Sequence, residues 1–187
     1  MRSIALLIYK ILVAIRSRYY IAYYSLVHGV EFGTNVRVYS RLIIHGPGKV
    51  VIGDGTRISS RRAINELCTT NPDAVLRIGS HCLLNGAIIG SAKSVTIGDR
   101  CIIAEAYIRD TSSHGMAPDQ RHLPGSGKIA PVELSDNVWI GSQSHVMPGV
   151  QIGENTVVGV NSVVTKSLPE NVFAAGSPAK VIHDLET

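Results

Sequence analysis

Residues 134–164 read LSDNVWIGSQSHVMPGVQIGENTVVGVNSVV, and every sixth residue of this stretch is aliphatic. The aliphatic positions are Leu134, Ile140, Val146, Ile152, Val158 and Val164, and glycine directly follows three of them. A helix would repeat its apolar residues every three or four positions, and a strand every second position. A period of six instead matches one flat side of a coiled parallel β-helix, in which three hexads make one coil of about 18 residues. We therefore predict an all-β coil.

Weaker copies of the hexad occur earlier in the chain, at Phe32, Val38, Ile44, Ile52, Ile58, Ile78, Leu84, Ile97 and Ile103. Two segments interrupt them. Residues 61–73 are polar and include Asn71-Pro72, which predicts a loop. Residues 109–131 carry no hexad and much polarity, and a long loop in a compact repeat protein is usually functional or disordered. The sequence thus predicts one coiled domain over residues 29–187 with a protruding loop at 109–131.

Residues 1–28 differ from the rest, because they contain no glycine or proline and hold five of the seven tyrosines. At helical spacing one face is apolar, comprising Ile4, Ile8, Ile11, Ile15, Ala22 and Leu26. Lys10 and Arg16 break the apolar run below the roughly 20 residues of a membrane span, and no signal-peptide cleavage site follows. We predict an N-terminal amphipathic helix that either caps the coil or packs between subunits, or lies at an inner-membrane surface.

Composition narrows the class of protein further. The 187 residues carry a net charge of +4 that is mixed along the chain, so no nucleic-acid partner is expected, whereas an anionic cofactor or an acidic membrane face would suit it. The three cysteines, Cys68, Cys82 and Cys101, show no metal-binding spacing, which favours a reducing compartment and no metal. Cys82 and Cys101 are expected to be small inward-facing core residues.

Two motifs carry a resemblance to a known family. The run Asp136-Asn137-Val138-Trp139-Ile140-Gly141-Ser142 and the closing Ala175-Gly176-Ser177-Pro178-Ala179-Lys180-Val181-Ile182 flank the regular hexads. Together they resemble the hexapeptide-repeat acyltransferases, and among these the sugar O-acetyltransferases of the galactoside, maltose and nodulation type and their polysaccharide-modifying relatives. The resemblance is good over residues 78–182 and looser over 32–58.

This resemblance implies a left-handed parallel β-helix assembled as a homotrimer, with active sites between neighbouring subunits. It implies acetyl-CoA as the co-substrate and a histidine in a protruding loop, which matches His114 here. A helical N-terminus shorter than that of the maltose-type enzymes favours the polysaccharide-modifying branch. Beyond the hexads the resemblance and Pro169 and Pro178 predict an extended C-terminal tail.

The chemistry can be argued from the residue types. A sugar hydroxyl attacks a thioester poorly unless its proton leaves as the bond forms, and histidine titrates near the working pH. His114 is therefore the expected general base, with His122 in the same loop as its rival. Asp110 is expected to orient the His114 ring, although a backbone carbonyl would serve equally well. By resemblance, Gly141 and Ser142 would supply the donors for the tetrahedral oxyanion.

The resemblance also implies roles for five further residues. Asn85 matches a position that contacts the acceptor sugar, Trp139 matches a tryptophan beside the catalytic histidine, and Thr165 and Lys166 match positions that line the coenzyme channel. Lys180 would add a second positive charge for the coenzyme phosphates. Each has a plain structural alternative, such as a turn for Asn85, subunit packing for Trp139 and a solvated charge for Lys180. Tyr107 is large for a position that is small in relatives, so the neighbouring acceptor pocket is expected to differ.

The sequence therefore favours a cytoplasmic, acetyl-CoA-dependent O-acetyltransferase. If the N-terminal helix lies at a membrane surface, the enzyme would be peripherally bound to the inner face of the plasma membrane. Its acceptor would be a sugar hydroxyl of a surface polysaccharide, namely capsule, O-antigen or exopolysaccharide, or of its precursor. N-acetylation of an amino sugar or nucleotide sugar is the main alternative. A zinc hydratase like the γ-class carbonic anhydrases, using His81, His114 and His122, and a non-catalytic scaffold are the remote ones.

Overall fold

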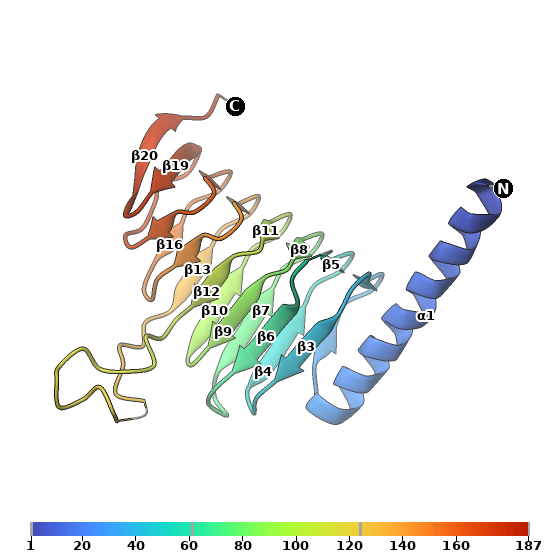
Figure 1. Cartoon of the computed structure of the whole chain (residues 1–187), viewed down its shortest axis with the longest axis horizontal. Helices are drawn as coiled ribbons and strands as arrows, with labels where there is room; N and C mark the ends of the chain where they lie inside the picture. The colour runs from blue at the N-terminus through green and yellow to red at the C-terminus, as the bar shows by residue number, and fades with distance from the viewer. Residues whose placement is uncertain (1, 61, 124, 187) are drawn as a thin grey trace.

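The computed structural model describes residues 2–60, 62–123 and 125–186, and it consists of one N-terminal helix and a long coil of short strands (Figure 1). The helix, α1, spans Arg2–His28. The strands form three sheets that run along the coil, and all neighbours in them are parallel except the last pair. The hexads therefore produce the predicted parallel β-helix.

The strands of each sheet are as follows, in spatial order. The first sheet contains β1 (Glu31–Phe32), β4 (Lys49–Ile52), β7 (Val75–Ile78), β10 (Ser94–Ile97), β13 (Val132–Leu134) and β16 (Gln151–Ile152). The second contains β2 (Arg37–Val38), β5 (Arg57–Ser59), β8 (Leu83–Asn85), β11 (Ile102–Ala104), β14 (Trp139–Ile140), β17 (Val157–Val158), β19 (Val172–Gly176) and β20 (Ala179–Asp184). The third contains β3 (Leu42–His45), β6 (Asn65–Thr69), β9 (Ile88–Ser91), β12 (Tyr107–Arg109), β15 (His145–Val146) and β18 (Val163–Val164).

The aliphatic residue of each hexad points into the coil. Leu134 pairs with Ile152 in the first sheet, Ile140 with Val158 in the second, and Val146 with Val164 in the third, and all six are at most 3% exposed. Partners are therefore 18 residues apart, as three hexads per coil predict. Cys82 and Cys101 are fully buried in the core, which confirms the prediction for these two thiols.

The chain turns three times per coil, and we name the turns corner 1–2, corner 2–3 and corner 3–1 after the sheets they join. At corner 1–2 successive coils approach so closely that glycine is required. A Cβ on Gly79 would lie 2.5 Å from the Gly98 carbonyl oxygen, and one on Gly98 would lie 2.5 Å from Asp136 Oδ1. Asparagines of adjacent coils also form hydrogen bonds along this corner, with Asn137 Nδ2 donating to Asn155 Oδ1 at 2.9 Å.

One predicted interruption of the coil is wrong in part. Residues 61–73 were expected to form a loop, but β6 (Asn65–Thr69) lies within them and pairs with β3 and β9. Leu67 supplies the inward aliphatic residue, and the buried Asn65 accepts hydrogen bonds from the backbone amides of Gly86 and Ala87 at 2.9 and 3.0 Å. A buried side-chain amide thus maintains the ladder where the hexad pattern is weak.

The predicted C-terminal tail is a hairpin rather than a free extended segment. β19 adds to β17 in parallel, and β20 folds back on β19 in antiparallel pairing after a turn at Ser177-Pro178. Pro178 ends the coil as expected, and the ladder hydrogen bonds of the reversed strand replace those that a further coil would have made.

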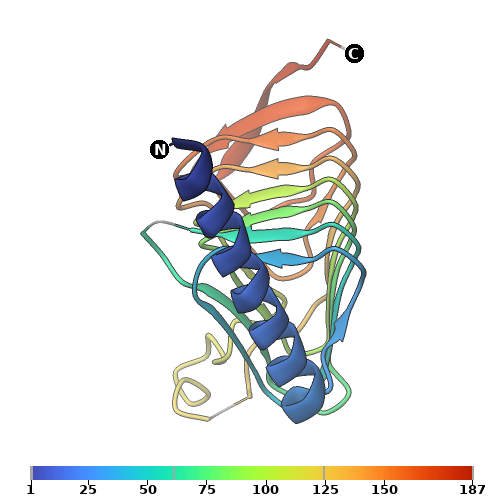
Figure 2. The same cartoon turned by 90° about the vertical axis from the view of Figure 1, so that its right-hand side faces the viewer.

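The helix α1 lies across the end of the coil beside the first strands, as Figure 2 shows. Its contact face is narrow. Val13 and Tyr24 are 5% and 7% exposed, the Tyr24 hydroxyl donates to the Leu42 carbonyl at 3.0 Å, and the Val38 amide donates to Ser17 Oγ at 2.8 Å. The helix therefore caps the coil, which is one of the two readings expected for it.

The apolar face predicted for this helix does not make that contact. Ile8, Ile15 and Leu26 are 52%, 60% and 86% exposed, because the buried residues lie on the opposite side of the helix. No helix in the described part of the chain is long and apolar enough to cross a membrane. The most hydrophobic face of α1 thus remains uncovered in the single chain.

Candidate functional site

The predicted site residues gather at two corners of the coil, one at each edge of the third sheet. Asn85, Trp139, Gly141 and Ser142 lie at or just before corner 2–3. Asp110, His114, Thr165 and Lys166 lie at corner 3–1. Lys180 lies apart from both, on the terminal strand β20. The fold thus divides the expected site into two halves.

Corner 2–3 carries a pocket of about 410 Å³. It is lined by Ser59, Ser60, Arg62, Asn85, Glu105 and Ser142, so it brings together Asn85 and Ser142, which are 57 positions apart in the sequence. Every lining side chain is polar and none is apolar. The pocket is therefore suited to a ligand with several hydroxyl groups, since each hydroxyl both donates and accepts.

Successive coils position the side chains of this pocket. Asn85 pairs with Ser59 in the coil before it and with Ala104 in the coil after it, so it sits in the middle of a three-strand ladder. Its backbone carbonyl accepts from the Glu105 amide at 2.7 Å, and the Glu105 carbonyl accepts from the Gln143 amide at 2.9 Å. The corner is thus held by the backbone, which leaves the side chains free for a ligand.

The two residues expected to stabilise an oxyanion, Gly141 and Ser142, differ in whether their hydrogen-bond donors are already used by the coil. The Gly141 amide donates to the Val158 carbonyl at 2.8 Å, so this donor is already used by the coil. Among the hydrogen bonds of the described residues, neither the amide nor the hydroxyl of Ser142 donates to a protein group. Ser142, rather than Gly141, is therefore the residue with donors available.

Sequence reasoning missed four residues of this pocket, namely Ser59, Ser60, Arg62 and Glu105. Arg62 is exposed and lies in the interruption between β5 and β6, a region that gave no motif. The backbone φ of Glu105 is +43°, a left-handed conformation that is rare for a residue with a side chain. That conformation places the residue at the turn of the corner, beside Asn85 and Ser142.

At corner 3–1 the chain leaves the coil after Arg109, the last residue of β12, and returns at Val132. Figure 1 shows the resulting loop projecting from the coil. Its two arms pair at the base, where Thr111 and Ile129 form an antiparallel bridge and the Ala130 amide donates to the Asp110 carbonyl at 2.9 Å. Farther out, Ser126 Oγ accepts from the Gly115 amide at 2.8 Å. The loop is therefore internally bonded.

Asp110 anchors this loop to the neighbouring coil. It is fully buried, and its two carboxylate oxygens accept from the backbone amides of Ala92, Lys93 and Ser94 at 2.6, 2.7 and 2.7 Å. No hydrogen bond of the described residues joins it to His114. The expected role of orienting the His114 ring is therefore not the one that its contacts support, because both oxygens already serve the backbone.

Asp110→Asn is expected to lower the free energy of unfolding by roughly 1–3 kcal/mol, because one acceptor facing backbone amides becomes a donor. Asp73→Asn, an exposed aspartate at the same corner, should change it by less than about 0.5 kcal/mol. Urea denaturation of both variants measures the difference. A stable Asp110→Asn protein with a shifted pH–rate profile would restore the role of orienting the base.

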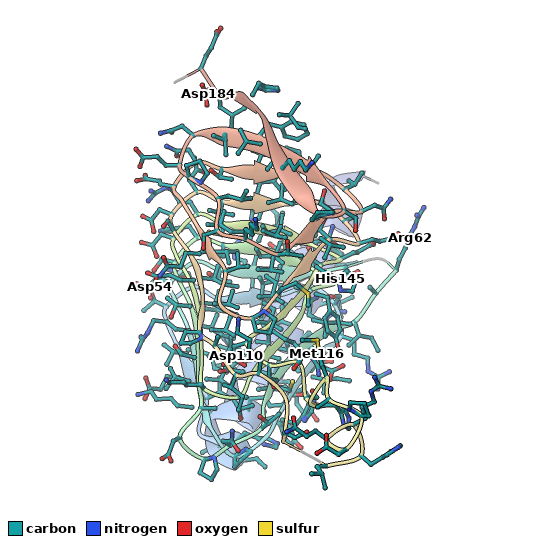
Figure 3. All side chains as sticks on the ribbon, turned by 90° about the vertical axis from the view of Figure 1, so that its left-hand side faces the viewer. Asp54, Arg62, Asp110, Met116, His145 and Asp184 are labelled. Carbon is teal, nitrogen blue, oxygen red and sulfur yellow. The ribbon has the colours of Figure 1, made fainter. Side chains whose placement is uncertain are left out.

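His114 lies in the loop, four residues after Asp110, and its side chain is exposed. Its backbone is fixed on both sides, since its amide donates to the Ser112 carbonyl at 2.7 Å and its carbonyl accepts from Ser112 Oγ at 3.2 Å. Figure 3 shows Asp110 at the foot of the loop and Met116 within it, while Arg62 projects from another edge of the coil. The histidine is thus presented outward from corner 3–1, as a base for an external substrate would be.

Four of the residues expected to bind the coenzyme are exposed, namely Trp139 at 49%, Thr165, Lys166 and Lys180, whereas Gly141 is buried and Ser142 is partly buried. Trp139 stands on the outer face of the second sheet between Ile102 and Val157. Thr165 and Lys166 follow β18 at the corner that also carries the loop, whereas Lys180 pairs with Ala175 in the terminal hairpin. The chain alone therefore does not assemble these four positions into one channel.

A second polar cluster lies on the third sheet between the two corners. His45 Nε2 is 3.1 Å from Glu66 Oε1, and Cys68 Sγ lies within 4.8 Å of both ligand atoms. Burial raises the pKa of the Cys68 thiol, although the Arg109 guanidinium acts in the opposite direction. The His45 ring and the Glu66 carboxylate already bond to each other, and we assign no metal to these three side chains.

The histidines of the zinc alternative do not come together in this chain. His81 lies at corner 1–2, where the imidazole faces Gly55, whereas His114 and His122 lie in the loop at corner 3–1. His122, the rival base, is exposed like His114. A three-histidine site would need atoms from different corners, and hence from different chains.

Sequence comparison gives direct relatives over part of the chain. The family model for the bacterial transferase hexapeptide (six repeats) matches residues 131–166. The galactoside O-acetyltransferase of Escherichia coli K12 is 42% identical over 94 residues, which are 49% of this chain and 45% of the relative. The "Putative lipopolysaccharide biosynthesis O-acetyl transferase WbbJ" of the same organism is 42% identical over 106 residues, 50% of this chain and 52% of the relative. The chain thus spans about half the length of each.

Structural comparison extends the likeness to most of the coil. A galactoside acetyltransferase in complex with coenzyme A matches 85% of this chain and 67% of its own, with a TM-score of 0.55 and 25% identity. AntD, an N-acyltransferase from Bacillus cereus in complex with dTDP and 3-hydroxybutyryl-CoA, matches 82% of each chain with a TM-score of 0.67, and its 24% identity shows the fold alone. These matches confirm the expected left-handed parallel β-helix.

Proposed function

We propose that this chain, which resembles the hexapeptide-repeat acyltransferases in repeats, coil and sequence, transfers an acetyl group from acetyl-CoA to a sugar hydroxyl. The observation that carries the proposal is the polar pocket at corner 2–3, which places Asn85 beside Ser142. The coenzyme A in the similar galactoside acetyltransferase structure supports the choice of acyl donor. Asn85 would bind the acceptor hydroxyls, and Trp139, Gly141, Ser142, Thr165, Lys166 and Lys180 would line the path of the coenzyme.

The transfer proceeds directly from thioester to hydroxyl. The acceptor oxygen attacks the thioester carbonyl as the His114 ring takes its proton, because an alkoxide cannot form freely near neutrality. The resulting oxyanion accepts hydrogen bonds from the Ser142 amide and hydroxyl. The carbon–sulfur bond then breaks, and the imidazolium returns the proton to the coenzyme sulfur. The products are an acetyl ester and free coenzyme A, and the enzyme is unchanged.

A homotrimer completes the site in this proposal. His114 and the Ser142 pocket lie at opposite edges of the third sheet, so the loop of one chain would reach the corner 2–3 pocket of its neighbour. In a closed cyclic assembly the same heterologous contact repeats at every interface, which gives one complete site between each two chains. The exposure of Trp139, Thr165, Lys166 and Lys180 fits such a shared channel.

The acceptor we propose is a surface polysaccharide, such as capsule, O-antigen or exopolysaccharide, or its precursor. The similarity to WbbJ supports it, and so does the uncovered apolar face of α1, which fits contact of residues 1–28 with a membrane surface. We place the reaction in the cytoplasm, where acetyl-CoA is made, at the inner face of the plasma membrane. No nucleic acid is involved, since the modest net charge of +4 is mixed along the chain.

The proposal is tested by thiol release from acetyl-CoA in the presence of neutral sugars, amino sugars, nucleotide sugars and oligosaccharide repeats. A neutral glycan should raise the rate at least about tenfold over hydrolysis in water, and prior treatment with a chelator should leave that rate unchanged. Product from an amino sugar only would establish N-acetylation instead. No acceptor-dependent release, or loss of activity on chelation, would contradict the proposed reaction.

A further inference from the structure

The helix α1 concentrates exposed apolar surface to a degree found nowhere else in the described part of the chain. Twelve of the 22 large apolar side chains that are exposed there belong to α1. We call the set Ile4, Ile8, Ile11, Ile15, Ala22 and Leu26 the outer face of α1. The helix of 27 residues is about 40 Å long. An apolar patch of this extent indicates a surface that is covered in use.

The charges of α1 are all of one sign. The helix contains no aspartate or glutamate, and Arg16 and Arg18 lie on either side of the outer face at helical spacing. The ion pairs of the described residues join Glu31 to Lys49, His45 to Glu66 and Arg100 to Asp136, so none uses Lys10, Arg16 or Arg18. The outer face is therefore an apolar surface with cations along its borders.

A groove of about 570 Å³ separates α1, between Leu6 and Ile21, from the first coil. Its floor is mainly apolar, with Tyr9, Val13 and Ile21 among its residues, and it also includes three cations. Lys10 and Arg18 come from the helix and Arg37 from β2, while no acidic residue lines it. Three cations beside an apolar floor are complementary to an anionic headgroup attached to a hydrocarbon chain.

We propose that α1 docks the protein on an anionic phospholipid bilayer. The outer face would enter the boundary between headgroups and acyl chains, and the Lys10, Arg18 and Arg37 groove would hold phospholipid phosphates. The proposed function supplies only the reason why docking would be useful, since an enzyme bound to the bilayer would meet a lipid-linked acceptor at the surface. Docking itself uses α1 and the adjoining Arg37 of β2, and it does not require catalysis.

The charge pattern favours a bilayer over a second copy of the chain. Two helices that both carry Lys10, Arg16 and Arg18 without any acidic residue would repel each other along their borders, whereas an anionic leaflet attracts them. The cations also break the apolar run, which fits a helix that lies in the interface and does not cross it. A lipid surface thus satisfies both the apolar and the charged parts of α1.

Vesicle flotation of the full-length protein tests the proposal, with phosphatidylcholine vesicles that lack or contain about one third phosphatidylglycerol. Binding to the anionic vesicles should be at least about tenfold stronger than to neutral ones and should fall steeply as salt is raised from about 0.1 M to about 0.5 M. Lys10→Glu/Arg18→Glu should weaken anionic binding at least about tenfold, and Ile8→Ser/Ile15→Ser should weaken it similarly. All four side chains are exposed in the single chain, so these variants should fold.

The matched control is Arg77→Glu/Lys93→Glu, which changes the net charge equally at two exposed positions away from α1 and should bind within about twofold of the parent. Equal loss in this control, or no binding of the parent protein, would overturn the proposal. So would Ile8→Ser/Ile15→Ser if it lowered the molecular mass of the assembly and left vesicle binding unchanged. Thermal protection by coenzyme A separates the two ideas, since its absence in the parent would contradict the enzymatic proposal and leave docking untouched.

Discussion

His114→Ala is expected to lower kcat by roughly 10²–10⁴-fold, because the acceptor hydroxyl loses the group that takes its proton. The exposed side chain contributes little to the core, so the free energy of unfolding should stay within about 0.5 kcal/mol of the parent. The dissociation constant for coenzyme A should change by less than about twofold, since the loss is confined to the transition state. Steady-state thiol release and calorimetric titration of coenzyme A measure the two quantities separately.

His122→Ala is the matched control for this change, because it removes a second exposed histidine from the same loop. It should retain kcat within about threefold of the parent. If His122→Ala were the inactive variant and His114→Ala the active one, the base would be reassigned to His122. Full activity of both variants would exclude a histidine base from this loop and contradict the proposed mechanism.

The sequence predicts the coil well because one physical rule repeats in it. Each hexad places its repeating aliphatic side chain inward, and Leu134, Ile140 and Val146 show the rule in three successive hexads. Where polar residues replace the pattern, prediction weakens, as it does at β6. There the stability of the strand comes partly from hydrogen bonds of the Asn65 side chain to the next coil, and no local period reveals a bond between residues 21 positions apart.

The apolar face named from the sequence is not the face that contacts the coil, for a related reason. Hydrophobic periodicity identifies the most apolar face, and that face is usually the one packed against the same chain. In α1 the coil instead contacts Val13, Ser17 and Tyr24, where two hydroxyls bond to backbone groups of β2 and β3. The sequence predicts which face of a helix is apolar, but which face packs against the rest of the chain depends on the elements beside it.

The candidate site was predicted as a set of residue types but not as an arrangement. Motifs named Asn85, His114 and Ser142, but the corner beside which each lies depends on how many residues each coil contains. The pocket also needs Ser59 and Glu105, which lie in no recognised motif and join it only through the stacking of coils. The spacing of residues along the chain therefore cannot predict which residues the stacked coils bring together.

A mixture of two inactive chains is expected to recover activity if the loop of one chain serves the pocket of another. One chain would carry His114→Ala and the other Asn85→Ala/Ser142→Ala, each with its own tag, and both would be expressed together. In randomly mixed assemblies about one quarter of the interfaces pair an intact loop with an intact pocket. Thiol release should therefore return from below about 1% to roughly a quarter of the parental rate.

Mixing the two separately purified proteins without subunit exchange is the control, and it should stay inactive because every interface then retains one defect. Recovery on co-expression would locate the site between chains, since no single chain in the mixture holds both His114 and Ser142. If His114 acted on the pocket of its own chain, co-expression would recover nothing, because each chain would still lack one half. The separation of the two corners by the third sheet makes the shared site the expected result.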